Sequence, residues 1–332
     1  MRLPVKPCLL LGLALLLCHA GCAHRYSIER QRRQAVYYHE SSASDTPIRR
    51  HAPLFRVHGF EHAYNRIGRP VATGAAGGGT CIRIAPDRPA VYTMMRQFST
   101  GRGLYTNYIY RLHFSEVPFS LYPFHLTAGN NVGLIVVITT DAGHRPLLVT
   151  VVHTCGCYLA IVPTTALAPE VFPTDWQRDG RQNVYGETLP ALLDFSTHPQ
   201  ARLLVTIRPG VHRAMDLAVV TGIEPSSDST VVRVPYPLIP AQRLHHLDLD
   251  GGEISLYHET GLLKGHVRGS VKPWETLLMS LISFDLFVGT DKAYVDPAST
   301  GNPFYTSLKP WNRNASDMWH FDRFLRFWGW RL

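Results

Sequence analysis

Residues 132–163 read VGLIVVITTDAGHRPLLVTVVHTCGCYLAIVP, and this stretch decides the fold class. Two apolar runs, Val132–Thr140 and Pro146–His153, flank a short turn of sequence Asp-Ala-Gly-His. Runs rich in β-branched residues on both sides of a turn that contains glycine predict a β-hairpin. The apolar pattern resumes at Tyr158–Pro163, which predicts a third strand in the same sheet.

Further strand signals surround this hairpin. The segments that read as strands are Val91–Phe98, Tyr105–Phe114, Leu203–Ile207, Leu217–Thr221, Val231–Val234, Leu244–Asp248 and Glu253–Tyr257. Because these short strands recur without long helices between them, we expect a mainly β protein with an antiparallel sandwich or barrel-like core. From about residue 270 the pattern becomes helical, so the predicted fold class is α+β overall, with helices at the C-terminus.

Two C-terminal helices are predicted. The first, over Pro273–Val288, has apolar residues at helical spacing, namely Trp274, Leu277, Leu278, Leu281 and Ile282. The second runs from Ser316, a good N-cap, through Trp328, with Trp319, Phe321, Phe324 and Leu325 on it. We expect this last helix to dock on the sheet. A face for a partner or a membrane interface is the alternative, because tryptophan favours such boundaries.

The N-terminus has the three-part layout of an export signal. Arg2 and Lys6 precede an apolar run, Leu9–Leu17, which small residues separate from Cys22. That run is far shorter than the roughly 20 residues that span a bilayer, so we expect removal of residues 1–21 as a signal peptide. Residues 22–52 are then predicted to be a polar tether with a short helix over Ile28–Tyr38, and 53–332 a single globular domain.

Ala20-Gly21-Cys22 resembles the end of the lipobox of bacterial lipoproteins, whose cysteine thiol accepts a diacylglyceryl group before cleavage. The resemblance implies lipidation at Cys22 and anchoring to a membrane. Ala23 after the cysteine implies the periplasmic face of the outer membrane. His19 replaces the aliphatic residue usual in the family, which keeps a soluble periplasmic form as the alternative. The resemblance covers only the first two dozen residues.

Composition narrows the class of protein. The 332 residues are 45% apolar and 17% charged, which is typical of a globular chain and not of a disordered one. The formal charge is +8, and between residues 25 and 69 there are nine arginines against four acids. We interpret this stretch as an ordinary solvated linker. Attraction to anionic headgroups close to a lipid anchor is the alternative. We expect no nucleic-acid partner, since an exported protein rarely meets one.

The strongest chemical signal is a cluster of cysteine and histidine. Cys155 and Cys157 follow His153 at the end of a predicted strand, and Cys81 is the other cysteine of the predicted globular part. In an oxidising compartment such cysteines are paired, metal-bound or catalytic. We favour a structural bridge from Cys81 to Cys155 or Cys157. Three thiolates with His153 would instead suit zinc or copper(I), and a small strained Cys155–Cys157 ring would suit redox exchange.

Other ligands and motifs are weaker. His113, His125 and His258 lie in or next to apolar segments and are predicted as additional metal ligands, although each alone is more often structural. The sequence has no Gly-x-Ser-x-Gly elbow, His-Glu-x-x-His helix or nucleotide fingerprint. We therefore expect an envelope lipoprotein with a binding, scaffolding or assembly role and an envelope protein partner. A metal-binding or thiol-redox protein is the alternative, and a hydrolase with scattered residues is a more distant one.

Overall fold

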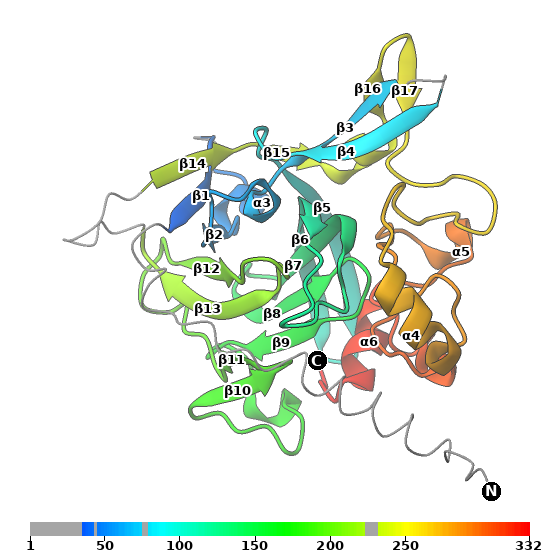
Figure 1. Cartoon of the computed structure of the whole chain (residues 1–332). Coiled ribbons are helices and arrows are strands. Elements are labelled where there is room, and N and C mark those ends of the chain that lie inside the picture. Colours follow the sequence, from blue (N-terminus) through cyan, green and yellow to red (C-terminus); the bar gives the residue numbers. More distant parts are fainter. Residues whose placement is uncertain (1–34, 43–44, 75–78, 223–231) are drawn as a thin grey trace, which may run out of the picture.

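The computed structural model describes residues 35–42, 45–74, 79–222 and 232–332. In these residues the chain is mainly β, with several sheets and short helices near the C-terminus (Figure 1). The predicted fold class is therefore confirmed. The predicted signal peptide, Cys22 and residues 28–34 of the predicted first helix lie outside the described residues.

A six-stranded sheet forms the centre of the molecule. Its strands, in spatial order, are β15 (Leu238–Pro240), β5 (Val91–Thr100), β6 (Gly103–Val117), β7 (Gly129–Thr140), β8 (Pro146–His153) and β9 (Leu159–Pro163). Strands β5 to β9 are antiparallel neighbours in chain order, while β15 joins the edge parallel to β5. The predicted hairpin is β7–β8, and the predicted third strand is β9.

A five-stranded sheet packs on one face of this central sheet. Its order is β13 (Ala214–Val220), β12 (Arg202–Ile207), β2 (Leu54–Val57), β1 (Val36–Glu40) and β14 (Val232–Tyr236). Buried side chains of both sheets form one hydrophobic core, which includes Tyr38 and Phe55 on one side and Tyr110 and Val136 on the other. The two sheets therefore make a β-sandwich, as the succession of short strands without long helices predicts.

The other face of the central sheet is covered by the C-terminal segment. Ile135 and Val137 of β7 belong to a second core with Phe304, Phe321 and Phe324. Strand β7 is thus buried on both sides, and every residue from 131 onward in it is buried. This explains why its sequence is continuously apolar instead of alternating, because a strand covered on both faces has no solvated side.

The remaining elements are short. The strands are β3 (Arg69–Gly74), β4 (Thr80–Ala85), β10 (Arg181–Val184), β11 (Glu187–Pro190), β16 (Leu247–Leu249) and β17 (Gly252–Ile254). The α-helices are α3 (Pro47–Arg50), α4 (Pro273–Ser283), α5 (Pro297–Thr300) and α6 (Phe321–Phe327), and the 3₁₀ helices are η2 (Ala63–Asn65), η3 (Pro169–Val171), η4 (Ala241–His245) and η5 (Pro310–Asn312). Hairpins β3–β4 and β16–β17 project together at one corner (Figure 1). In the described part, no helix has the length and apolar character that a membrane crossing requires.

The N-terminal boundary of the fold differs from the prediction. Strand β1 falls within the predicted tether of residues 22–52, where it pairs with β2 and β14. Val36 and Tyr38 are buried while Tyr37 between them is not, so these residues follow the two-residue period of a strand. The end of the helix predicted over Ile28–Tyr38 is therefore wrong, and the folded body begins before residue 53.

The last helix also starts later than predicted. Ser316 is not an N-cap: its backbone carbonyl accepts hydrogen bonds from the amide and hydroxyl of Thr306, and the segment before α6 is irregular. Helix α6 begins at Phe321 and docks on the sheet as expected, with Phe324 fully buried. Trp328 lies just after it and is 38% exposed, so it contributes less to the core than predicted.

Candidate thiol site

The tight turn between β8 and β9 carries both cysteines. The amide of His153 donates to the carbonyl of Tyr158, and the amide of Gly156 donates to the carbonyl of His153 at 2.8 Å. Gly156 has a φ of +85°, and a Cβ added there would lie 2.1 Å from the carbonyl oxygen of Tyr305. Only glycine fits this position, because the left-handed conformation and the close backbone both exclude a side chain.

Cys155 and Cys157 form a disulfide across this glycine, with their Cα atoms 5.5 Å apart. Cys155 is 3% exposed, whereas Cys157 is only partly buried. Cys81 lies on β4 as an exposed free cysteine. The favoured bridge from Cys81 is therefore wrong. Its strand pairs with β3 in a separate two-stranded sheet, and the two other cysteines lie close enough to pair with each other.

His153 lies beside the disulfide. Its Nδ1 is 3.7 Å from Sγ of Cys157, and the ligand atoms of His153, Cys155 and Cys157 all lie within 4.8 Å of one another. Burial, followed by the positive charges of Lys272 and Arg213, holds the pKa of His153 well below its ordinary range. The imidazole is therefore neutral, which is the form that binds a metal ion.

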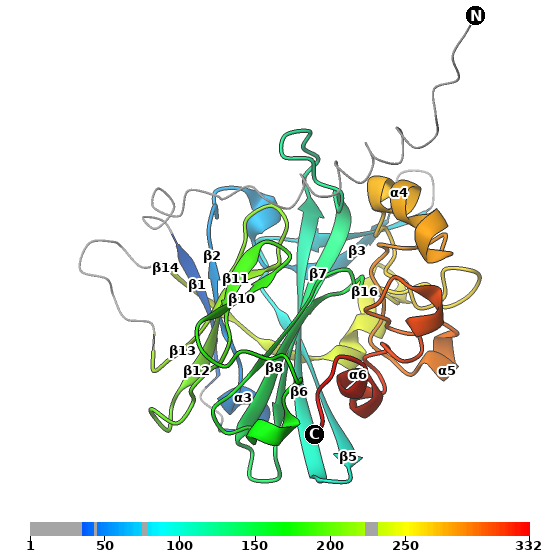
Figure 2. The same ribbon diagram turned by 90° about the horizontal axis from the view of Figure 1, so that it is seen from below.

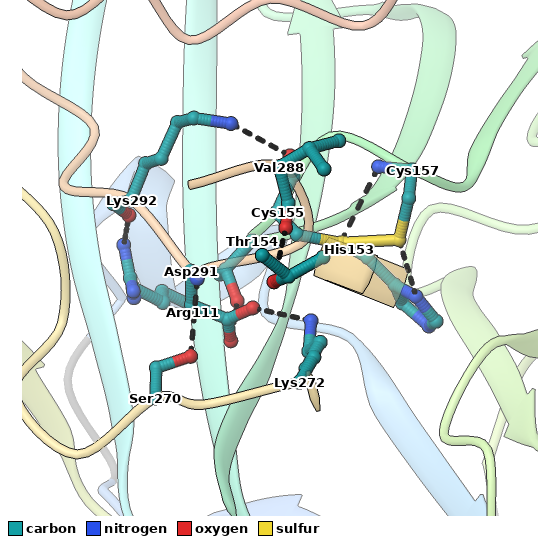
Figure 3. A network of polar contacts seen from close by, with 11 residues as sticks. Arg111, His153, Thr154, Cys155, Cys157, Ser270, Lys272, Val288, Asp291 and Lys292 are labelled. Atoms are coloured by element: carbon teal, nitrogen blue, oxygen red, sulfur yellow. Dashed lines mark hydrogen bonds and ion pairs between the residues drawn. A yellow bond between two sulfur atoms is a disulfide. The ribbon is translucent and has the colours of Figure 1, made fainter. Parts of the chain in front are cut away.

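A buried ion pair fixes the turn to the C-terminal segment (Figure 3). Nζ of Lys272 lies 2.7 Å from Oδ1 of Asp291, and these side chains are only 3% and 1% exposed. Oδ2 of Asp291 accepts a hydrogen bond from the hydroxyl of Thr154 at 2.5 Å. The backbone amide of Asp291 donates to Oγ of Ser270. A buried charge needs such partners, because removing one of them leaves an uncompensated ion.

A second buried lysine contacts the turn directly. Nζ of Lys292 donates to the carbonyl of Cys155 at 3.0 Å and lies 4.0 Å from the centre of the Tyr305 ring. Burial lowers the pKa of Lys292 to about 8. Burial also raises the pKa of Glu275, whose side chain is 3% exposed. The turn that carries the disulfide is therefore in contact with a lysine whose ammonium form is destabilised by burial.

The three other predicted ligands do not join this cluster in the described residues. His113 is buried on β6 against the edge of the Tyr92 ring. Nδ1 of His125 lies 3.0 Å from the carbonyl of Pro118 in the loop between β6 and β7. The amide of His258 donates to the carbonyl of His266. The side chains of His113 and His125 have local contacts of their own, and the grouped ligand atoms are those of His153, Cys155 and Cys157.

Sequence reasoning missed the polar residues that surround the turn. Lys272, Asp291 and Lys292 lie in segments that read as solvated loop or helix start, and Thr154 and Tyr305 carried no signal. The one hint was the Asp291-Lys292 pair, directly before Ala-Tyr-Val, an apolar triplet of strand-like composition. Comparisons with protein-family models, curated proteins and solved structures find no match for this chain.

Proposed function

We propose that Cys155 and Cys157 form a thiol–disulfide exchange centre in an envelope protein that a lipid on Cys22 holds to a membrane. The observation that carries the proposal is a disulfide closed across a single residue, with the partly exposed Cys157 beside a neutral imidazole. The proposed membrane location rests on the lipobox-like sequence that ends at Cys22. The binding or assembly role expected from the sequence stays a prediction.

The Cys155–Cys157 disulfide contributes little to the stability of the fold. In the chain-entropy model, closing a loop of about three residues stabilises a fold by only about 1.6 kcal/mol, whereas a 15-residue loop gives about 3 kcal/mol. The turn is also fixed by its own hydrogen bonds and by Lys272, Asp291 and Lys292. A disulfide that adds little to stability is better explained by its chemistry.

The two sulfurs have different surroundings, which assigns them different roles. Cys157 is the more exposed residue, so its Sγ is the atom that an incoming thiolate would attack. Cys155 is a buried residue, and its Sγ accepts the amide of Cys157 at 3.4 Å, a contact that stabilises a thiolate there. A stabilised thiolate leaves faster, so Cys155 is the leaving group.

The exchange reaction is balanced by a partner dithiol. A partner thiolate attacks Sγ of Cys157, the Cys155–Cys157 bond breaks, and Cys155 leaves as a thiolate and takes up one proton. The partner's second thiolate attacks the mixed disulfide and releases Cys157, which takes up the second proton. The partner is oxidised by two electrons and the protein holds two thiols.

Metal binding by the reduced form is a second candidate, favoured by the 4.8 Å grouping of the three ligand atoms. Two thiolates and one imidazole suit copper(I), which accepts low coordination numbers and soft ligands. They leave a structural zinc site one ligand short, because such sites take four and Cys81 is not among the grouped residues.

A redox titration tests the proposal. The full chain is equilibrated in glutathione buffers, and free thiols are counted by the mass that a maleimide reagent adds. We expect reversible two-electron reduction between about −270 and −120 mV, the range of exchange proteins. Cys81→Ser is the matched control and keeps the transition, whereas Cys155→Ser abolishes it. A bond that stays oxidised below about −300 mV is structural and overturns the proposal.

A further inference from the structure

Helix α4 is inverted: it buries its polar residues and exposes its apolar ones. Glu275 and Ser283 are 3% and 0% exposed, while Leu277, Leu281 and Ile282 are 65%, 84% and 64% exposed. A surface helix of a soluble domain normally has the opposite arrangement. Aliphatic side chains on the outer side of a helix are expected where another apolar phase covers that side.

The exposed apolar side chains continue beyond the helix onto two neighbouring segments. Phe284 and Leu286 follow α4 and are 77% and 76% exposed. The loop between β6 and β7 lies at the same end of the molecule (Figure 2), and the ring of Phe119 lies 6.0 Å from that of Trp274. We call this surface the apolar face; its exposed members are Phe119, Leu121, Tyr122, Val271, Trp274, Leu277, Leu278, Leu281, Ile282, Phe284 and Leu286.

The charges around the apolar face are those that a lipid surface tolerates. The only acids in residues 271–286 are Glu275, which is buried, and Asp285, whose side chain is 16% exposed and accepts the hydroxyl of Tyr305. Residues 117–124 carry no charge. At the end of α4, Arg313 donates to the carbonyl of Ser283. Basic and aromatic residues without exposed carboxylates are typical of membrane-interface surfaces.

We propose that the apolar face lies in the interfacial region of a phospholipid bilayer. Its side chains are exposed on a helix, on the turn after it and on a separate loop at the same end of the molecule, and the Phe119–Trp274 contact joins the loop to the helix. Trp274 and Tyr122 supply the amphipathic rings that prefer the headgroup level. The contact is peripheral, with the helix lying along the surface and its polar side held by the protein.

The length of the predicted tether is consistent with this placement. Thirteen residues separate Cys22 from Val36 at the start of β1. At most about 3.5 Å per residue, they reach roughly 45 Å. A domain of about 300 residues has a radius of gyration of about 19 Å. An anchor at Cys22 therefore leaves enough chain for the apolar face to meet the same membrane.

Vesicle binding tests the face independently of any lipid anchor. The chain from residue 22 onward, with Cys22→Ser, is mixed with vesicles of phosphatidylethanolamine and phosphatidylglycerol at 3:1, and the bound fraction is measured by flotation. We expect Leu281→Asp, added to this chain, to weaken binding roughly ten-fold, because a charge replaces an inserted aliphatic group. Leu104→Asp is the matched control, since Leu104 is 49% exposed in the β5–β6 hairpin at the far end of the molecule. Binding stays unchanged in that control.

A second measurement reports on the face itself. Brominated phospholipids quench tryptophan at the depth of the acyl chains, and we expect quenching that disappears with Trp274→Phe. Equal binding by the Leu281→Asp chain together with an unquenched Trp274 would overturn the proposal. A dimer in solution that Leu281→Asp dissociates, with no vesicle binding by either chain, would assign the face to a second copy of this protein and overturn it as well.

Discussion

Helices α4 and α6 both carry apolar residues at helical spacing, but α6 turns these residues toward the core and α4 turns them toward the outside. Phe321, Phe324 and Leu325 of α6 are at most 2% exposed, whereas Leu281 of α4 is 84% exposed. The surfaces beneath the helices differ. Under α6 lies the aromatic ring of Phe98, 5.4 Å from that of Phe321. Beneath α4 lie the buried ions of the thiol site. Helical spacing of apolar residues thus predicts a helix, but the partner surface decides which side turns inward.

The largest expected effect is on α6. Phe324→Ala removes a fully buried ring from the core that α6 shares with β7. Such deletions cost about 3–5 kcal/mol, because the transfer free energy is lost and a cavity remains. Urea unfolding of the full chain measures this loss. A decrease below about 1 kcal/mol would mean that α6 is only loosely docked, and the contrast with α4 would fail.

An intermediate effect is expected from the ions beneath α4. Burial lowers the pKa of Lys292 from 10.5 to about 8. Between these values the unfolded chain binds a proton that the folded chain does not, so the free energy of unfolding rises with pH. At 1.36 kcal/mol per pH unit the full rise is about 3 kcal/mol. Below pH 8 both states are protonated and Lys292 adds no slope.

The measurement is urea unfolding at intervals from pH 8 to 9.5. The upper limit avoids the ionisation of tyrosine. Burial raises the pKa of Tyr305, so above pH 10 the unfolded chain loses a proton that the folded chain keeps, and the free energy of unfolding falls with pH. The control is Lys292→Met, which keeps an apolar stem over the Tyr305 ring and should remove the rise. If the variant keeps the same slope as the wild type, Lys292 is not the titrating group.

The smallest effect is expected on the outer side of α4. Leu281→Ala removes a side chain that the protein barely contacts, so the free energy of unfolding should change by no more than about 0.5 kcal/mol. The same urea assay, with Phe324→Ala measured beside it, provides the scale. A loss of more than about 2 kcal/mol would show that Leu281 is packed in solution, and the two helices would then be alike.

The sheet was predictable because its signal is local. Strands β7 and β8 are continuous apolar runs around a short turn, and the chain needs no distant partner to reveal them. Strand β1 was missed because Val36 and Tyr38 are its only buried apolar residues, and its partner β14 lies almost 200 residues away. Edges formed by long-range pairing leave little trace in a short window of sequence.

The site was predictable only in its covalent part. The spacing His153, Cys155, Cys157 pointed to three residues that the structure brings together. The predicted pairing of Cys81 was wrong because a count of cysteines does not show which of them lie close together. In the structure, β4 with Cys81 belongs to a different sheet from the strands that flank the Cys155–Cys157 turn. Lys272 and Lys292 were missed because a lysine in a polar loop reads as solvated. Only the tertiary fold makes it buried.

The site joins segments that ribosomes make at different times. Lys272 is added 115 residues after Cys157, and Lys292 and Tyr305 come later still. At roughly 5–20 residues per second, the cysteine turn exists for several seconds or more before its cover can be completed. During that interval neither cysteine is covered by the C-terminal segment, and afterwards Cys155 is enclosed. The order of synthesis therefore means that the two cysteines become unequal late, when the last segments fold and leave Cys157 as the more accessible one.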